Sequence, residues 1–325
     1  LYLKSYLFLT LAVILRSMKI DLTKPLVNAL TIIAVLTVLI AIIGAFSTSL
    51  FWRIHEVGFR YDIFCLGGAR LYGGNIFPRI AAVYFYTSEM MVLPLGYFTV
   101  KTFFSNEGKK LQYGLLLMIT IFAMFISTTR NNILAAILLP FMVAFWYSKR
   151  KKIIFGLLIV LFLYSIFNLD LIISTFFDSS SPSNAWKMQF VKDYANLLND
   201  DRVFLFGQGM GSFFKTKNRG YVSVTELTYF EFIRQFGVLL FIPMLVLLFY
   251  PLTKLFSRRY ERSHYLFIAY LFILGMTFFN PLLMSSSGML LLSVVLFKTF
   301  PPSEDVSFIE KKRGAESLAE PEALA

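Results

Sequence analysis

LVNALTIIAVLTVLIAIIGAF, residues 26–46, is a stretch of 21 residues without a charged side chain. Because an α-helix rises about 1.5 Å per residue, a helix of this length covers about 30 Å, the thickness of the hydrocarbon core of a bilayer. The composition agrees, since 57% of the 325 residues are apolar and only 15% are charged. A soluble domain carries more charge, so the sequence predicts an integral membrane protein.

Apolar windows of similar length recur along the chain and predict an all-α polytopic membrane protein with about nine transmembrane helices. We place them near residues 1–15, 26–46, 79–100, 111–127, 131–148, 153–170, 227–252, 264–280 and 284–300. The first begins directly at Leu1, which leaves room for further spans upstream of this sequence. We treat residues 1–313 as one transmembrane domain and the polar tail, residues 314–325, as disordered or as an artificial extension.

Basic residues separate the loops between these spans into two alternating sets. One set of short loops, together with the C-terminal tail, holds 18 of the 31 Lys and Arg residues, and by the positive-inside rule it faces the cytoplasm. Its members are Arg16, Lys19, Lys24, Lys101, Lys109, Lys110, Lys149, Arg150, Lys151, Lys152, Lys254, Arg258, Arg259, Arg262, Lys298, Lys311, Lys312 and Arg313. The other set consists of two long loops, about residues 47–78 and 171–226, and two short turns at 127–132 and 280–284, which are then extracytoplasmic.

The long loop at residues 171–226 contains two patterns. Apolar residues recur at helical spacing in AWKMQFVKDYANLLNDD, residues 185–201, and predict an amphipathic helix that lies along the membrane. The stretch FGQGMGSF, residues 206–213, alternates glycines, but no βαβ pattern surrounds them and a dinucleotide site is not indicated. A tight backbone turn near the membrane surface fits these glycines better.

The composition gives little support to metal, disulfide or nucleic-acid chemistry. Cys65 is the only cysteine and cannot form a disulfide within the chain, and His55 and His264 are the only histidines. A cluster of Cys and His ligands is therefore excluded, and we expect neither a metal nor another cofactor. The net charge of +12 is concentrated in the cytoplasmic loops, so we expect no nucleic-acid partner.

STTRNN, residues 127–132, connects two predicted spans and carries Arg130 on the side where the topology disfavours positive charge. Arg130 is the only basic residue in either short outer turn. Two explanations stay open. In the first, the guanidinium has a structural role and either extends to the membrane surface or pairs with a loop carboxylate. In the second, it binds an anion at the outer surface.

PRIAAVYFYTSEMMVLPLGYF, residues 78–98, opens the third predicted span with Arg79 and places Glu89 about two to three helical turns deeper. Charged side chains inside a span are costly, and they usually have a specific partner or function. Glu89 therefore either neutralises a neighbouring arginine or contacts the substrate directly, and we include it among the candidate substrate-binding residues.

The chain re-enters the membrane through TELTYFEFIRQFG, residues 225–237. Spacings of three and four place Glu226 and Tyr229 on one helix face, where we expect both to meet a membrane-bound substrate. Glu231 and Arg234 are three residues apart, and we expect them to satisfy each other. Glu226 lies at the mouth of the helix, where a carboxylate either acts on the substrate or simply caps the helix N-terminus.

The order of these features resembles the bacterial O-antigen polymerase and O-antigen ligase superfamily, which includes capsule and exopolysaccharide polymerases. The resemblance covers about residues 79–297 and rests on the PR and SE pairs of the third span, on STTRNN, FGQGMGSF and TELTYFEFIRQFG, and on NPLLMSSSG, residues 280–288. It implies a multi-pass glycosyltransferase of the bacterial inner membrane with its active site on the periplasmic side. The donor and the acceptor would be undecaprenyl-diphosphate-linked oligosaccharides, and a chain-length regulator protein is a conceivable partner.

The resemblance also implies roles for individual residues. It aligns Arg79 and Arg130 with the family's diphosphate-binding arginines, and Lys187 with a further basic residue that opens the helix of the large loop. Lysine there is a point charge in place of a guanidinium fork. Family ligases carry a histidine, usually followed by asparagine, where this chain has Glu226. The departure favours a polymerase over a ligase and makes Glu226 the candidate catalytic base.

Three other functions are alternatives to the polymerase. An O-antigen ligase, with lipid A core as acceptor, would be supported by a histidine near position 226, and the sequence has none there. A transporter or flippase for an anionic or lipid-linked substrate would need charges near the bilayer midplane and repeat symmetry. The unexplained charges lie instead at the outer surface, although Glu89 and Arg234 are deep enough to keep this alternative open. A metal-dependent glycosyltransferase would need a paired acidic motif in the first outer loop, which is absent there.

Overall fold

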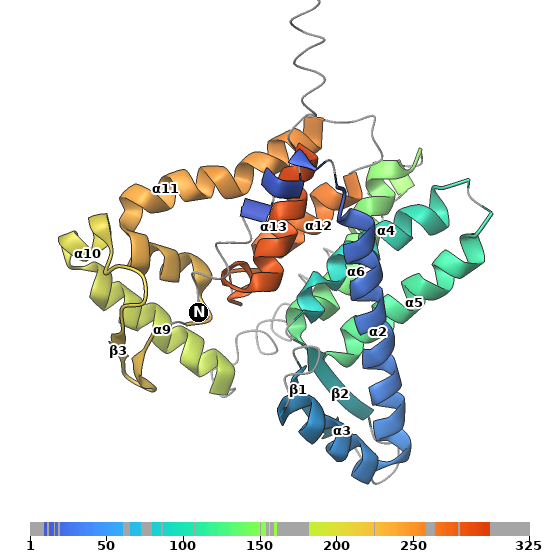
Figure 1. Cartoon of the computed structure of the whole chain (residues 1–325), viewed down its shortest axis with the longest axis horizontal. Helices are drawn as coiled ribbons and strands as arrows, with labels where there is room; N and C mark the ends of the chain where they lie inside the picture. The colour runs from blue at the N-terminus through green and yellow to red at the C-terminus, as the bar shows by residue number, and fades with distance from the viewer. Residues whose placement is uncertain are drawn as a thin grey trace, which may run out of the picture.

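The computed structural model describes residues 10–60, 66–72, 80–153, 182–257 and 264–299, apart from positions 12, 16, 19, 86, 107, 150, 224 and 279, together with residues 156, 159 and 160. Three of the helices in these ranges are long and apolar enough to cross a membrane. They are α2 (Thr23–Phe46), α6 (Arg130–Tyr147) and α11 (Thr228–Ser257), shown in Figure 1. The protein is therefore a helical membrane protein, as the sequence predicts.

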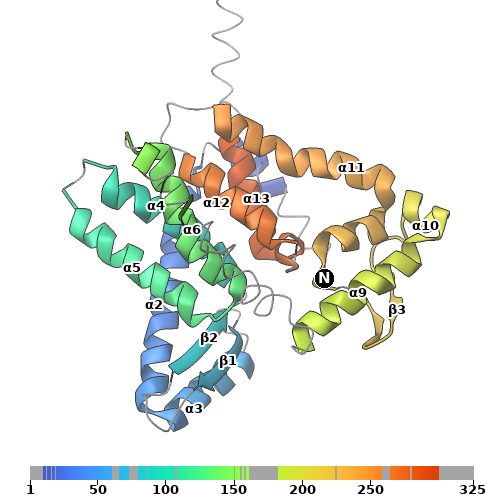
Figure 2. The same cartoon turned by 180° about the vertical axis from the view of Figure 1, so that it is seen from behind.

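Shorter helices pack beside these three and complete the bundle (Figure 1, Figure 2). They are α4 (Val92–Phe103), α5 (Lys110–Ile126), α12 (His264–Met276) and α13 (Ser286–Thr299). Their inner faces share one core of buried apolar side chains, among them Leu93, Leu139, Ile273 and Val295. The predicted spans 1–15 and 153–170 lie mostly outside the described residues, so the total of nine spans stays a prediction.

The described helix ends gather at two opposite ends of the bundle. At one end the backbone N–H of His264 donates to the hydroxyl of Tyr147 at 3.1 Å, and Lys298 pairs with Asp21 at 2.6 Å. The opposite end carries Arg130, the first residue of α6, and we call it the Arg130 end. Loops that the sequence assigns to the same side of the membrane thus lie together.

The predicted span at residues 79–100 is wrong in its first half. Residues 80–85 form a strand, β2 (Ile80–Phe85), which pairs antiparallel with β1 (Leu66–Tyr72), and a short 3-10 helix, η2 (Ser88–Met91), leads into α4. Ala81, Val83 and Phe85 alternate along β2 and are buried in a small cluster with Phe51 of α3 (Thr48–Arg60). Such a short apolar run is ambiguous between strand and helix from sequence alone.

Residues 182–223 form a compact unit beside α11, which we call the loop unit. It contains α9 (Pro182–Leu198), α10 (Asp201–Phe206), β3 (Phe214–Thr216) and β4 (Gly220–Val222). The apolar face of α9 buries Phe190 and Tyr194 against Phe214 and Leu227. This face is therefore covered by other parts of the protein, whereas the sequence predicts that the amphipathic helix lies along the membrane.

A buried ion pair joins the loop unit to the first turns of α11. Arg234 and Glu231 pair as the sequence predicts, and both side chains are fully buried. The Arg234 guanidinium also donates to the hydroxyl of Ser212 at 2.8 Å and to the backbone carbonyl of Ser223 at 2.8 Å. Tyr194 of α9 donates to the Glu231 carboxylate from the other side. The pair thus connects three segments of the loop unit to one helix.

Arg234→Met is expected to lower the free energy of unfolding by about 3 to 5 kcal/mol, because it leaves the Glu231 carboxylate buried without its cation. Denaturation of the purified protein in detergent measures the loss. The double variant Glu231→Gln/Arg234→Met removes both charges, and it should recover part of the stability. An Arg234→Met protein as stable as the parent would contradict the structural role of the pair.

Gly237 interrupts α11 and forms the joint against which the glycine loop packs. Its φ of 67° and ψ of 168° break the helix, in a region of backbone conformation that is essentially restricted to glycine. A Cβ at this position would lie 2.2 Å from the backbone oxygen of Leu205. At Gly207, also at positive φ, a Cβ would lie 2.6 Å from the backbone oxygen of Gln235. Gly207, Gly209 and Gly211, which are predicted to form a tight turn, all have positive φ. Of these three, Gly207 permits direct backbone packing, and it does so together with Gly237.

Gly237→Ala is expected to cost at least about 2 kcal/mol, since it combines backbone strain with a steric clash against α10. Gly209→Ala is the matched control. Gly209 also has positive φ, at 89°, but a Cβ there would meet nothing within 4 Å. Thermal unfolding of both variants separates the clash from the strain, and equal losses would show that the approach of Leu205 to Gly237 adds nothing.

Candidate functional site

Arg130 is held at the start of α6 by a well-bonded turn. Thr128 adopts a φ of 51°, unusual for a residue other than glycine, and the side-chain amide of Asn132 donates to the hydroxyl of Ser127 at 2.9 Å. The half-buried guanidinium of Arg130 donates from Nη1 to Oδ1 of Asn184 at 3.1 Å. Arg130 therefore reaches across to the first turn of α9, 54 residues away in the sequence.

The second turn of α9 brings a second cation to the Arg130 end. Asn184 and Lys187 are three residues apart, so they share one helix face. Lys187 Nζ lies 3.5 Å from Oε2 of Glu226, and the two side chains are 25% and 39% exposed. A pair this exposed adds little stability, about 1 kcal/mol or less, so its geometry leaves both groups accessible to a ligand.

Glu226 lies in the turn before α11, which begins at Thr228. The prediction that Glu226 and Tyr229 share one helix face is therefore wrong, because Glu226 lies before the helix begins. Both neighbours of Glu226 are anchored, since Thr225 bonds to the Tyr194 hydroxyl at 2.6 Å and Leu227 is buried. A partly exposed carboxylate between two buried residues has a defined position and access to solvent.

Glu89 is the second carboxyl group of the site and is buried. It lies in η2, between the hairpin and α4, and not deep in a helix as predicted. The side-chain amide of Asn280 donates to it. Burial raises the pKa of Glu89 to about 8, while the charge of Lys187 and the bond from Asn280 act in the opposite direction. At neutral pH Glu89 is therefore mostly protonated.

The raised pKa of Glu89 predicts a stability that depends on pH. A carboxyl group whose pKa is higher in the folded protein stabilises the fold fully below its ordinary value of 4.5, and this contribution is lost as the pH rises through about 8. Glu89→Gln is neutral at every pH and should flatten the decline. Unfolding temperatures from about pH 5 to about pH 9 measure it, and parallel curves for the two proteins would contradict the shift.

The site also contains two asparagines, Asn184 and Asn280, that were not predicted from the sequence. Asn184 contacts Arg130, and Asn280 contacts Glu89 while its backbone carbonyl accepts a bond from the Thr228 hydroxyl at 2.9 Å. The sequence indicates Asn280 only as the first residue of a short outer turn. One signal was present for Asn184, because it precedes Lys187 by one helical turn on the same face.

The remaining predicted site residues lie elsewhere or outside the described part. The Tyr229 hydroxyl donates to the backbone carbonyl of Leu274 at 2.9 Å, and its ring contacts Phe278 within the helix bundle. This contact gives Tyr229 a packing role between α11 and α12. Arg79 lies outside the described residues.

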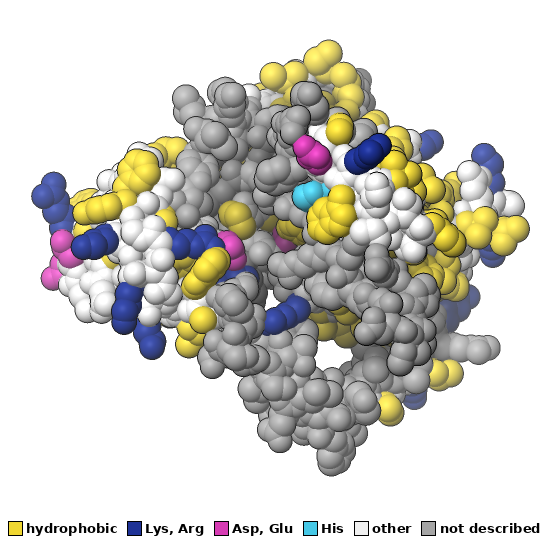
Figure 3. Space-filling view, turned by 90° about the horizontal axis from the view of Figure 1, so that it is seen from below, with side chains coloured by type: hydrophobic (Ala, Val, Ile, Leu, Met, Phe, Trp, Pro, Cys, Tyr) yellow, Lys and Arg dark blue, Asp and Glu magenta, His cyan; other side chains and the backbone are white. Residues whose placement is uncertain are grey.

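Arg130, Lys187, Glu226 and Glu89 therefore converge from four separate segments at one end of the bundle. With Glu89 protonated, positive charge exceeds negative charge in this cluster, which favours an anionic ligand beside one exposed carboxylate. Figure 3 views the molecule from below, and basic side chains outnumber acidic ones over the part of that face formed by the loop unit. No group of three or more His, Cys, Asp or Glu side chains in the described ranges is arranged to hold a metal.

The fold and this cluster define a helical membrane protein with a mixed-charge site where the helices end. No protein-family model, curated protein or solved structure matches the chain. The chemistry of the site must therefore be inferred from its own residues and from the family resemblance in sequence pattern.

Proposed function

We propose that the protein is a polysaccharide polymerase of the O-antigen and capsule type. It would transfer a growing glycan from undecaprenyl diphosphate to a hydroxyl of the next lipid-linked repeat unit. The observation that carries the proposal is the convergence of Arg130, Lys187 and Glu226 at one end of a helical membrane bundle. These residues come from three segments that the resemblance singles out independently.

Arg130 and Lys187 suit the diphosphate of the donor. Diphosphate is already a good leaving group, so cleavage at the anomeric carbon mainly requires that the growing negative charge be stabilised. A guanidinium offers two parallel donors to phosphate oxygens, and an ammonium adds a mobile point charge. Lys187 lies beside the Glu226 carboxylate but is not sequestered by it, because this pair is partly exposed.

Glu226 suits the acceptor. The attacking sugar hydroxyl must lose a proton as the new glycosidic bond forms, and a carboxylate within hydrogen-bonding distance can accept it. A single displacement of this kind inverts the anomeric centre. Glu89 is a poorer candidate for direct contact because it is 1% exposed and bonded to Asn280. We assign Glu89 a structural role, because its contact with Asn280 joins η2 to the segment that follows α12.

The two histidines favour the polymerase over the ligase. His264 is buried at the opposite end of the bundle, where it stacks on Trp146. His55 lies on α3 and contacts Trp52. Neither histidine belongs to the cluster formed by Arg130, Lys187, Glu226 and Glu89. A ligase of this superfamily would be expected to carry its histidine there.

We further propose that the Arg130 end faces the periplasm in the bacterial inner membrane, and that the whole domain crosses the membrane about nine times. The orientation is supported by the sequence, in which the basic residues gather in the loops assigned to the opposite end. Donor and acceptor would then both be lipid-linked and would approach laterally from the outer leaflet.

Elongation of a lipid-diphosphate glycan by the purified protein tests the proposal. The protein in nanodiscs is incubated with a synthetic polyprenyl-diphosphate oligosaccharide, and products are separated by length. A ladder of longer glycans on lipid diphosphate is expected, without added metal or nucleotide. Absence of elongation, together with flux of the same lipid across vesicle membranes, would favour the transporter and overturn the polymerase.

A further inference from the structure

α10 and the glycine loop after it expose a row of large apolar side chains. On a surface facing water, such a row is uncommon unless it binds a partner or a membrane. The exposed fractions are 41% for Phe204, 39% for Leu205, 65% for Phe206, 48% for Met210 and 64% for Phe213.

The row adjoins the joint at Gly237 of α11. The backbone N–H of Gly209 donates to the carbonyl of Gln235 at 3.1 Å, and Leu205 touches Gly237 through its backbone oxygen. α10 is therefore fixed to α11 at one level of the helix and cannot turn its exposed face inward without breaking this backbone packing.

That level is where α11 changes its surroundings. Phe232 and Gln235, before Gly237, are buried. Leu239, Leu240 and Ile242, after it, are 53%, 61% and 54% exposed. The arm after the joint runs to Ser257 and measures about 30 Å, which matches the hydrocarbon core of a bilayer. The exposed apolar surface of the spanning arm thus begins at the joint and continues onto α10.

We propose that α10 and residues 207–213 form a membrane anchor, with their exposed apolar row inserted into the lipid leaflet at the Arg130 end. The occupant of this surface is lipid because the row adjoins, at the Gly237 joint, the exposed apolar side chains of an arm long enough to span a bilayer. Phenylalanine and methionine suit the boundary between headgroups and acyl chains.

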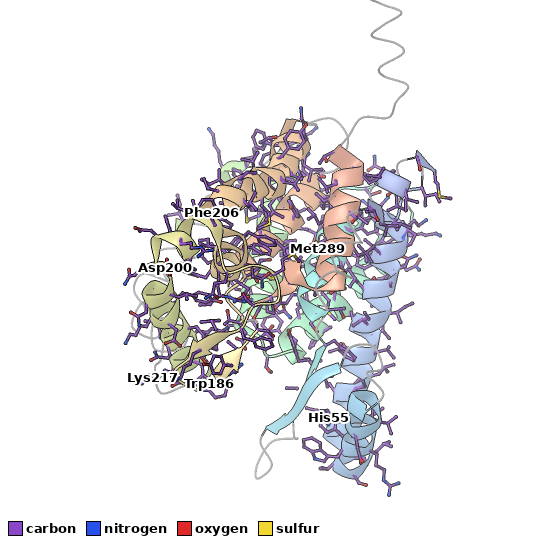
Figure 4. All side chains as sticks on the ribbon, turned by 60° about the vertical axis from the view of Figure 1, so that its left-hand side comes forward. His55, Trp186, Asp200, Phe206, Lys217 and Met289 are labelled. Carbon is purple, nitrogen blue, oxygen red and sulfur yellow. The ribbon has the colours of Figure 1, made fainter. Side chains whose placement is uncertain are left out.

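The polarity of α10 fits insertion by its C-terminal end. Asp200 caps the helix by accepting a bond from the backbone N–H of Arg202 at 2.9 Å, and these residues are exposed. Figure 4 shows Asp200 and Phe206 at the two ends of α10, with Lys217 and Trp186 at the far end of the loop unit. Phe206 thus lies on the side of the spanning arm, while Lys217 lies at the other end of the loop unit.

The anchor would add a membrane contact to the attachments that join the loop unit to α11, which are the Gly237 joint and the buried pair of Glu231 and Arg234. This contact would help to fix the orientation of α9, whose first two turns carry Asn184 and Lys187. The anchor is independent of the reaction proposed above, because it follows from exposure and backbone packing alone.

Site-directed fluorescence tests the anchor. With Cys65 replaced by serine, a single cysteine at position 206 (Phe206→Cys) or 217 (Lys217→Cys) carries an environment-sensitive nitrobenzoxadiazole label. Both proteins are reconstituted in phosphatidylethanolamine and phosphatidylglycerol nanodiscs, with or without lipids bearing a nitroxide on the acyl chain. Both positions are exposed, so the labels should leave the fold intact, which circular dichroism checks.

We expect a blue-shifted label at position 206 and lipid quenching severalfold stronger than at position 217. Equal, weak quenching at both positions would overturn the anchor. A blue shift at position 206 without lipid quenching would also overturn it, because a second copy of the chain or another protein would then cover the row.

Discussion

Glu226→Gln is expected to reduce glycan transfer by about 100-fold to 10,000-fold while donor binding stays nearly unchanged. Glutamine keeps the size of the side chain and a hydrogen-bonding carbonyl, but it cannot accept the proton of the acceptor hydroxyl. A general base contributes about this factor to a reaction rate. Initial rates of elongation at saturating donor, with donor affinity measured separately, give the two quantities.

The alternative is that Glu226 serves only as the ion partner of Lys187 or as a charge near the start of α11. In that case Glu226→Gln should cost about 1 kcal/mol of stability or less and leave turnover intact. Glu56→Gln is the control, because Glu56 is an exposed carboxylate on α3. If Glu226→Gln elongates glycan within a few-fold of the parent, Glu226 is not the base, and Glu89→Gln is the next variant to test.

Helix formation was largely readable from the sequence because long apolar segments have few alternatives. α2, α5, α6, α11, α12 and α13 all lie where apolar windows predict them. The prediction failed at residues 79–100, because one span was predicted where the structure has a strand followed by a helix. A six-residue strand whose alternate side chains are buried has no polar face to reveal it, so hydropathy alone cannot separate it from the helix that follows.

The candidate site was predictable as a set of residues but not as a geometry. Glu226 could be selected as a carboxylate at the mouth of a predicted span, and Lys187 could be selected from the family resemblance. Their approach to 3.5 Å depends on how α9 packs against Leu227, which no local pattern encodes. Asn184 and Asn280 are neutral and sit at helix ends, where asparagine is common. No sequence signal separated Asn280 from ordinary end residues, and the signal for Asn184 was its position one helical turn before Lys187.

The buried pair of Glu231 and Arg234 illustrates the opposite case. Its spacing of three residues predicts the pair correctly, because both partners lie on one helix turn. The bonds from Arg234 to Ser212 and Ser223 could not be predicted, since they depend on the kink at Gly237 and on the docking of the glycine loop. Local spacing thus predicts local pairs, while contacts between segments require the fold.

Arg130→Ala is expected to reduce elongation by roughly 100-fold or more and to weaken donor binding. Each charge-assisted hydrogen bond to phosphate contributes about 1.5 to 3 kcal/mol, and about 1.4 kcal/mol corresponds to a factor of ten. Arg130→Lys should recover little of this activity, because an ammonium cannot offer two parallel donors. Titration of the donor in nanodiscs and the elongation assay measure the two effects.

A structural role for Arg130 would give a different pattern across a matched pair of variants. Arg130 donates to Asn184, so Asn184→Ala removes this bond between α6 and α9 but keeps the guanidinium. If Arg130 acts on the diphosphate, Asn184→Ala should retain most of the activity, with a modest loss from looser positioning. Equal losses in Arg130→Ala and Asn184→Ala, accompanied by equal losses of thermal stability, would mean that Arg130 only holds α9 in place. Diphosphate binding would then have to rest on Lys187 and on other basic residues.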